Sequence, residues 1–140
     1  MQDIIPMLAY ENGIAAIEWL CKAFGFIENK EMRFIEGERL THAELRLNEN
    51  IIMLATPSED YRSINKQRNE YVQMNKWMSV PYIVNGLLVY VDNIYRHYKT
   101  SEENGAVILS EIEDGFPGKR YRCADLEGQR WMFIEKEQQA

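Results

Sequence analysis

The chain has 140 residues, of which 46% are hydrophobic and 27% charged, and its formal net charge is -6. This composition predicts a soluble folded protein with one core or two small fused cores. The charge is scattered, and no lysine and arginine stripe with interleaved aromatic residues occurs, which argues against nucleic-acid binding. No basic leader and no apolar run of roughly 18 residues occurs, so we expect a cytoplasmic protein without a membrane span.

The first half of the chain predicts a strand, a helix and three further strands. The apolar run from Ile4 to Tyr10 is typical of a strand. Asn12 is a candidate N-cap for a helix with one apolar stripe, which Gly25 would end. The next strands are expected at residues 29–35, 41–47 and 51–55.

A polar connector over residues 57–82 separates the two halves of the chain. It is longer than a compact domain usually leaves without structure. Its aromatic residues, Tyr61, Tyr71, Trp77 and Tyr82, indicate that it is ordered. We expect it to cover a cleft or to contact a second subunit, with Trp77 buried there.

The second half repeats the order of the first. The segment Gly86 to Val91 (GLLVYV) predicts a strand, and Asp92 or Asn93 would cap a helix that ends at Asn104 and Gly105. Three more strands are expected at residues 106–110, 119–124 and 130–135.

The repeated order indicates an internal duplication. Gly25 with Gly105, and Met53 with Met132, lie about 80 residues apart. We therefore predict an α+β fold of two tandem βαβββ modules, residues 1–56 and 83–140, within one structural domain. Each helix would cover one face of a curved mixed sheet, and the free faces would form a concave cleft.

Five segments resemble a known family over nearly the whole chain. They are PMLAYENGIAAIEWLCKAFGF, THAELRL, IIMLA, GLLVYVDNIYRHY and ADLEGQRWMF. They resemble the glyoxalase, bleomycin-resistance and extradiol-dioxygenase superfamily, also called vicinal oxygen chelate proteins. HAEL and the long connector are most similar to its PhnB-like branch, whose activities are largely unassigned. In the last segment Leu126 stands where the family usually has proline.

The segment ADLEGQRWMF predicts a hairpin. Asp125 can cap the turn, and Gly128 can adopt the positive φ that lets the chain reverse. Trp131 and Phe133 would then lie on the face that packs on the helix, as core residues, and Met132 would lie on the other face.

The resemblance implies a test for a metal. Metal-dependent members of the family hold a divalent ion with one His or Glu from the first and fourth strands of each half. The corresponding positions here are Ile5, Met53, Gly86 and Met132. None of them binds such an ion as histidine or carboxylate does. Their only oxygen-bearing neighbours are Asp3 and Asn85, so we predict no metal and no other cofactor.

The segment Thr41 to Leu47 alternates in polarity and supplies the polar candidates. His42, Glu44 and Arg46 would share the face opposite the helix and look into the cleft, or would form an ordinary wet strand face. His42 and Glu44 could be a proton-transfer pair, two ligands of an unusual metal site, or a strand-face salt bridge.

The other candidates are expected on the cleft walls. Met53 and Met132 would line the cavity, although core filling explains them equally well. Tyr90 and Tyr121 would lie on the side of Met132. The complete set of expected ligand-binding residues is His42, Glu44, Arg46, Met53, Trp77, Tyr90, Tyr121 and Met132.

Several remaining residues carry weaker functional hypotheses. Arg120 and Arg122 could bind an anionic ligand or be ordinary surface charges. His97 has no acidic or histidine partner at ligand spacing and is expected to be a partly exposed helix residue. Cys21 and Cys123 are expected to be reduced, packed thiols.

The resemblance and the unsuitable metal positions predict a metal-independent homodimer that binds a small molecule. An antibiotic-like or polar aromatic ligand would be sequestered in the cleft. The alternative is an enzyme of lyase, isomerase or transferase type that uses His42 and Glu44 for acid-base chemistry or for an atypical metal site. A third hypothesis is a dimeric interaction module with a vestigial cleft.

Overall fold

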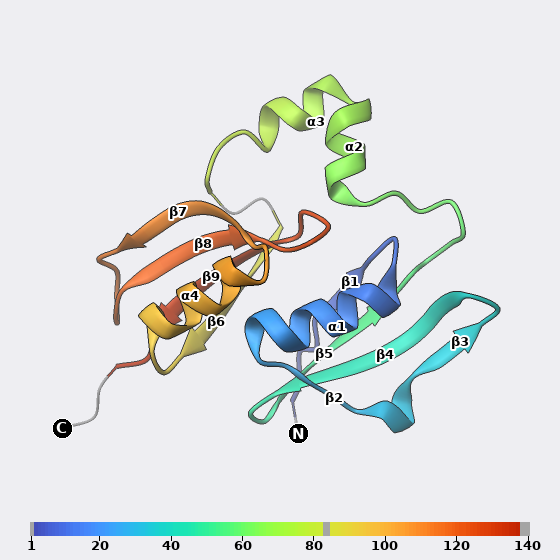
Figure 1. Ribbon diagram of the computed structural model, residues 1–140, viewed down its shortest axis with the longest axis horizontal. Helices are drawn as coiled ribbons and strands as arrows, with labels where there is room; N and C mark the ends of the chain where they lie inside the picture. The colour runs from blue at the N-terminus through green and yellow to red at the C-terminus, as the bar shows by residue number, and fades with distance from the viewer. Residues whose placement is uncertain (1, 83–84, 138–140) are drawn as a thin grey trace. The chain divides into compact units, whose positions relative to one another are not determined.

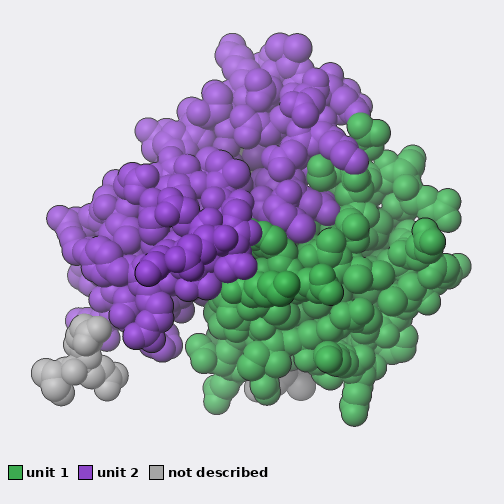
Figure 2. Space-filling model, viewed as in Figure 1, with its two compact units in different colours: residues 1–63 green, residues 64–140 purple. Residues whose placement is uncertain are grey.

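A computed structural model describes residues 2–82 and 85–137. The chain forms two compact units, Met1–Ser63 and Ile64–Ala140, which Figure 2 distinguishes by colour. The boundary falls inside the predicted connector, because the connector's two helices belong to the second unit. Within the described residues, no helix is long and apolar enough to cross a membrane.

The first unit is a mixed sheet with one helix on one face (Figure 1). Its sheet has the order β1-β5-β4-β2, with β3 also paired to β4. Strand β1 runs parallel to β5, and the other pairs are antiparallel. The elements are β1 (Met7–Ala9), α1 (Gly13–Phe24), β2 (Ile27–Glu28), a 3-10 turn (Lys30–Met32), β3 (Phe34–Glu36), β4 (Arg39–Leu47) and β5 (Asn50–Ala55).

The strand predicted at residues 29–35 is wrong as a continuous element. The 3-10 turn Lys30–Met32 separates β2 from β3. Arg33 bridges this break, because its Nε and Nη2 each donate to a carboxylate oxygen of Glu28 at 2.7 Å. The alternation in the sequence did not reveal this local ion pair.

Both predicted ends of helix α1 are confirmed. The side chain of Asn12 accepts a hydrogen bond from the amide of Ala15 at 3.1 Å. Gly25 has a φ of 83°, and its amide donates to the carbonyl of Cys21 at 3.2 Å. The buried stripe of the helix packs on β4, where Ala43 and Leu45 are fully buried.

Gly13 allows α1 to approach β4 closely. A Cβ atom at Gly13 would lie 2.5 Å from Cδ2 and 2.9 Å from Cβ of Leu40, a residue that is itself buried. We expect Gly13→Ala to lower the free energy of unfolding by about 1–3 kcal/mol. Chemical denaturation measures this change in free energy. At exposed helix positions Gly→Ala is stabilising, so a Gly13→Ala variant more stable than the wild type would contradict the prediction.

The second unit repeats the topology of the first. Its four-stranded sheet has the order β6-β9-β8-β7, which corresponds strand by strand to β1-β5-β4-β2. The α+β fold with duplicated βαβββ modules is therefore confirmed. The elements are α2 (Ile64–Glu70), α3 (Val72–Trp77), β6 (Gly86–Val91), α4 (Ile94–Glu103), β7 (Val107–Glu113), β8 (Arg120–Ala124) and β9 (Arg130–Glu135).

The core of the second unit lies between its sheet and α4. Trp131 and Phe133 are fully buried there, as predicted, and their rings stack with centroids 6.2 Å apart. Asp125 and Gly128 have the predicted places in the hairpin. The carboxylate of Asp125 accepts from the amides of Glu127 and Gln129 at 3.0 Å, and Gly128 has a φ of 99°. Asp125 also accepts from Trp131 Nε1 at 3.1 Å, so the turn is tied to the core.

The connector is ordered, but Trp77 is not its buried residue. Trp77 is 62% exposed within the chain, whereas Met78 is 6% exposed. The expectation that Trp77 is buried is therefore wrong within the chain. Met78, the residue that follows α3, is the buried one. Contact of Trp77 with a second subunit stays a prediction.

Candidate functional site

The open face of the first sheet, opposite α1, carries the predicted polar candidates. In β4 the side chains of Ala43 and Leu45 are buried against α1, so those of His42, Glu44 and Arg46 lie on the other face. The predicted alternation is therefore confirmed.

Cross-strand pairing brings methionines to the same face. Glu44 lies opposite Met53 of β5, and Met53 lies opposite Met7 of β1. Met7 is 79% exposed. A polar pair on β4 is thus flanked by soft, adaptable apolar side chains from two neighbouring strands.

His42 and Glu44 contact each other. The Nε2 atom of His42 lies 3.3 Å from Oε2 of Glu44, and their side chains are 30% and 13% exposed. The ring of Phe34, which lies opposite His42 in β3, is 6.0 Å away between centroids. A carboxylate beside an accessible imidazole can accept its N–H and orient the ring, which suits a proton-transfer pair as well as a structural contact.

Two hollows adjoin this polar pair in the first unit. One, of about 230 Å³, is lined by Met7, Ala9, Met53 and Ala55, with Thr41 and His42 at its polar side. The other, of about 360 Å³, is bordered by Ile27, Glu44, Arg46 and Ile51. The second hollow is also bordered by Glu28 and Asn29 and is the more polar of the two. The first has mainly apolar walls with a few polar groups, as small-molecule sites do.

The open face of the second sheet, opposite α4, is apolar along β6 and β9. Leu88 lies opposite Met132, and Tyr90 follows two residues later on the same face. Leu88 and Tyr90 are 46% and 48% exposed. The predicted positions of Tyr90 and Met132 on one face are therefore confirmed, and Leu88 is a neighbour that sequence reasoning missed.

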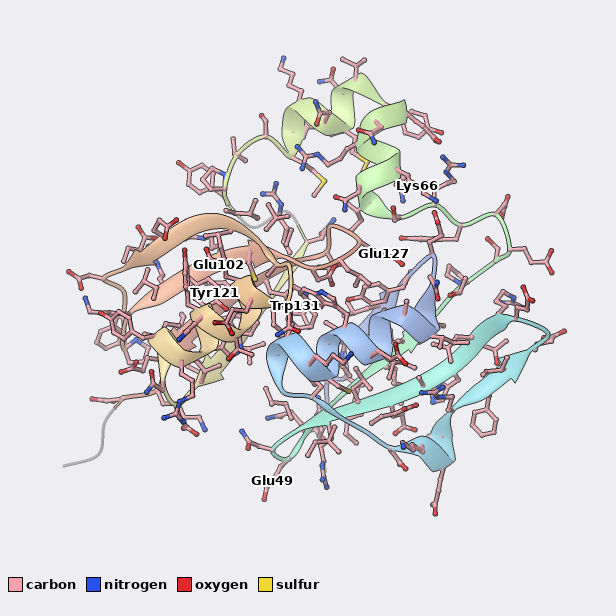
Figure 3. The ribbon with its side chains drawn as sticks, in the orientation of Figure 1. Glu49, Lys66, Glu102, Tyr121, Glu127 and Trp131 are labelled. Atoms are coloured by element: carbon pink, nitrogen blue, oxygen red, sulfur yellow. The ribbon has the colours of Figure 1, made fainter. Side chains whose placement is uncertain are left out.

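Tyr121 does not share this face, contrary to expectation. Its partner across β8 and β9 is Phe133, and Tyr121 is fully buried (Figure 3). The expectation assumed a tight turn, whereas the loop at residues 125–129 pairs Ala124 with Arg130. The resulting register turns Tyr121 and Cys123 toward α4 and away from Met132.

Tyr121 instead belongs to a buried polar cluster beneath α4. Its hydroxyl lies 2.7 Å from Nδ1 of His97 and 2.8 Å from Oγ of Ser101. His97 is partly exposed, as predicted, but its contact with Tyr121 was not foreseen. Burial raises the pKa values of Tyr121 and Cys123 well above their usual ranges, so both stay neutral at physiological pH.

Both cysteines are free thiols, as the sequence predicts. Cys123 is fully buried and Cys21 partly buried. Burial, and then the nearby Glu28 carboxylate, raise the pKa of Cys21. A thiol of raised pKa is a poor nucleophile, so neither cysteine has the setting of a reactive residue.

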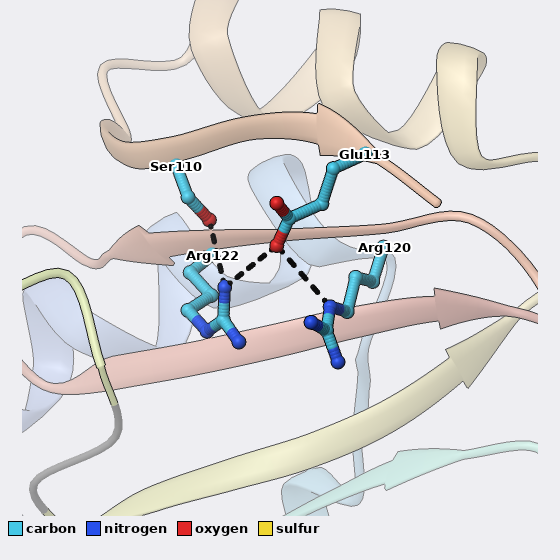
Figure 4. A network of polar contacts seen from close by, with 4 residues as sticks. All are labelled: Ser110, Glu113, Arg120 and Arg122. Atoms are coloured by element: carbon cyan, nitrogen blue, oxygen red, sulfur yellow. Dashed lines mark hydrogen bonds and ion pairs between the residues drawn. The ribbon is translucent and has the colours of Figure 1, made fainter. Parts of the chain in front are cut away.

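Arg120 and Arg122 lie on the open face of the second sheet with a shared partner (Figure 4). Oε1 of Glu113 accepts from Arg120 Nε at 3.2 Å and from Arg122 Nη1 at 3.0 Å. Arg122 Nη1 also lies 3.3 Å from Oγ of Ser110. The hydrogen bonds from Arg122 and then Arg120 lower the pKa of Glu113. Sequence reasoning missed Glu113 because it ended this strand at Ser110.

The residues at the family's metal positions do not fit a divalent ion. Strand pairing sets Met7 opposite Met53 and Leu88 opposite Met132, so the first-strand positions fall two residues beyond the expected Ile5 and Gly86. None of these four side chains is a ligand for a hard or borderline cation. Within residues 2–82 and 85–137, no three His, Cys, Asp or Glu side chains are grouped so as to hold a metal.

Duplicated βαβββ modules with open sheet faces define the class of protein to which this chain belongs. The sequence profile of the Glyoxalase/Bleomycin resistance protein/Dioxygenase superfamily matches residues 7–133. The chain is therefore a member of that superfamily. No curated protein matches it significantly.

Solved structures share the fold over nearly their whole length. TioX from Micromonospora sp. ML1 is 24% identical, with a TM-score of 0.67 over 99% of both chains. PA1353 from Pseudomonas aeruginosa is 13% identical, with a TM-score of 0.65 over 99% of this chain and 100% of that chain. TnmS3, an antibiotic binding protein from Streptomyces sp. CB03234, is 11% identical, with a TM-score of 0.61 over 96% of this chain and 98% of that chain.

Proposed function

We propose that this protein is a metal-independent small-molecule-binding protein whose ligand is an antibiotic-like or polar aromatic compound. The open face of each sheet, taken by itself, is a proposed ligand surface. The observation that carries the proposal is the hollow of the first unit lined by Met7, Met53 and His42, where apolar side chains adjoin the imidazole that contacts Glu44. A similarity of fold to the antibiotic binding protein TnmS3 supports it.

Metal independence is supported by the side chains at the family's metal positions. Met53 and Met132 are soft thioethers, and their partners Met7 and Leu88 are apolar. Such a set favours contact with an apolar ligand over coordination of a hard cation. The binding residues that we propose on these faces are His42, Glu44, Arg46, Met53, Tyr90 and Met132, with Trp77 contributing from the connector.

The neutral fluorescent aromatic N-phenyl-1-naphthylamine tests this function. We expect saturable binding by protein that has been treated with EDTA, and an affinity about tenfold lower in Met53→Ala, which removes one of the two methionines that line the first hollow. Fluorescence titration measures both affinities. Met32→Ala, in the 3-10 turn and outside both hollows, is the matched control and should bind as the wild type does.

Two results would contradict the proposed function. One is the absence of saturable binding in the EDTA-treated wild type. The other is binding that appears only when Zn²⁺, Ni²⁺, Fe²⁺ or Mn²⁺ is added, since that dependence would place a metal in the site.

The contact between His42 and Glu44 favours a second candidate function. The 3.3 Å separation, next to a hollow, suits an enzyme in which the pair transfers a proton to or from a bound substrate. Turnover with a steep pH dependence that disappears in His42→Ala would support the enzyme. Ligand binding without product, in wild type and variant alike, would support the binder.

We also propose that the protein is a cytoplasmic homodimer and belongs to the PhnB-like branch of the superfamily. Exposed large apolar side chains on the first unit, including Ile4, Met7 and Ile27, support a second subunit as a partner. A midpoint of unfolding that rises with protein concentration would support the dimer, and a concentration-independent midpoint would count against it.

A further inference from the structure

Two arginines lie on the face of the second sheet that the proposed ligand uses. Arg122 is paired with Met132 across β8 and β9, and Arg120 with Ile134. Tyr121 lies between the two arginines in β8, and Cys123 follows Arg122. Both Tyr121 and Cys123 are buried on the side of α4. Because side chains alternate along a strand, both guanidinium groups lie on the open face.

The arginine pair keeps a net positive charge. Its two guanidinium groups share the single carboxylate of Glu113, which binds Arg120 through Nε and Arg122 through Nη1. Figure 4 shows one nitrogen of each guanidinium group joined to the same carboxylate oxygen of Glu113. Among the described residues, the buried Nε of Arg122 has no hydrogen-bond acceptor. The chain therefore satisfies these two cations only in part.

The surroundings of the pair are apolar. Leu88 and Tyr90 are about half exposed on the same face, and Met132 lies directly opposite Arg122. The chain as a whole has a formal charge of -6, so the positive charge here is a local feature. A cation beside exposed apolar and aromatic surface suits a molecule that has an acidic group on an aromatic body.

We propose that Arg120 and Arg122 form an anion-binding subsite, and that the natural ligand is an aromatic small molecule with a carboxylate, phosphate or sulfonate group. This inference rests on the proposed function, since it specifies the chemistry of a ligand at the open face of the second sheet, where Tyr90 and Met132 are proposed binding residues. Glu113 holds the two arginines in place through its carboxylate. An incoming anion takes over part of their hydrogen bonding, so Glu113 competes with the ligand.

A pair of fluorescent probes with the same aromatic body tests the subsite. The anion is 8-anilinonaphthalene-1-sulfonate, and the neutral compound is N-phenyl-1-naphthylamine. We expect Arg122→Gln to weaken binding of the sulfonate about tenfold and to change binding of the neutral probe by less than about twofold. Arg96→Gln, an exposed arginine on α4 and so on the covered side of the sheet, removes the same charge and should change neither affinity.

Glu113→Gln separates a ligand site from a structural ion pair. We expect it to tighten sulfonate binding severalfold, because the competing carboxylate is gone, and to leave the neutral probe unaffected. A purely structural network would give no tighter binding. The gain should shrink as salt is added, since the attraction is electrostatic.

The outcomes distinguish the two proposals. If the neutral probe binds but Arg122→Gln affects both probes equally or neither, the anion subsite is wrong and the binding function stands. If the wild type binds neither probe, both proposals fail. Should Arg122→Gln unfold, as circular dichroism would show, Arg120→Gln and Glu113→Gln replace it. Unchanged sulfonate affinity in both of those variants would overturn the subsite.

Discussion

Replacing Trp131 by alanine should lower the free energy of unfolding by about 3–5 kcal/mol. Trp131 is fully buried beneath α4, stacks with Phe133, and donates through Nε1 to the Asp125 carboxylate. The variant loses a large apolar contact and leaves part of the buried Asp125 carboxylate without its donor. Urea denaturation followed by circular dichroism measures the loss.

Trp77→Ala is the matched control, because it deletes the same side chain at a position that is 62% exposed. We expect a change within about 0.5 kcal/mol. Equal losses for the two tryptophans would contradict the assignment of the core. A loss for Trp77→Ala that grows with protein concentration and shrinks on dilution would instead show that a second subunit covers Trp77.

Arg130→Met should lower the free energy of unfolding by about 2–4 kcal/mol. Arg130 is 2% exposed, and its guanidinium donates to the carbonyls of Met78, Val80 and Tyr82. Burial lowers the pKa of Arg130, so the charge is held there by these oxygens. In Arg130→Met the carbonyl groups of these three residues lose their donor, and we expect the connector to separate from β9.

Arg130→Lys provides a graded test of the same contact. Lysine keeps the charge, but its single ammonium group cannot reproduce the planar fork, so we expect roughly half the loss. Proteolysis of residues 78–82 should be faster in both variants. Arg96→Met on the surface of α4 is the control, and a loss for Arg130→Met no larger than that of the control would refute this role.

Local signals accounted for most of the fold. Helix α1 begins after Asn12, whose side chain caps it, and ends at Gly25, whose backbone adopts a positive φ. The predicted duplication is repeated in the strand order of the two sheets. Where local patterns predicted an element's bounds wrongly, an ion pair or a contact between distant segments set the bounds instead. Examples are the Glu28–Arg33 bridge that divides the second strand and the longer β7 that presents Glu113.

The candidate site was predicted unevenly. Alternation along β4 was sufficient for His42 and Glu44, because residues two apart on one strand share a face whatever their neighbours are. Tyr121 was misplaced because its face depends on the register between β8 and β9, and the loop that sets this register was longer than the expected turn. The partners of Arg120 and Arg122 likewise depended on where β7 ends.

The sequence by itself determined the family and the duplicated modules, because both reside in residue identity and short-range spacing. Strand pairing was needed to move two of the family's metal positions from Ile5 and Gly86 to Met7 and Leu88. Only the tertiary structure decided which side chains meet: Tyr121 with His97, Arg130 with the connector, and Glu113 with two arginines. Cross-strand register and loop length set these contacts. Both depend on packing and hydrogen bonding between segments that are far apart in the chain.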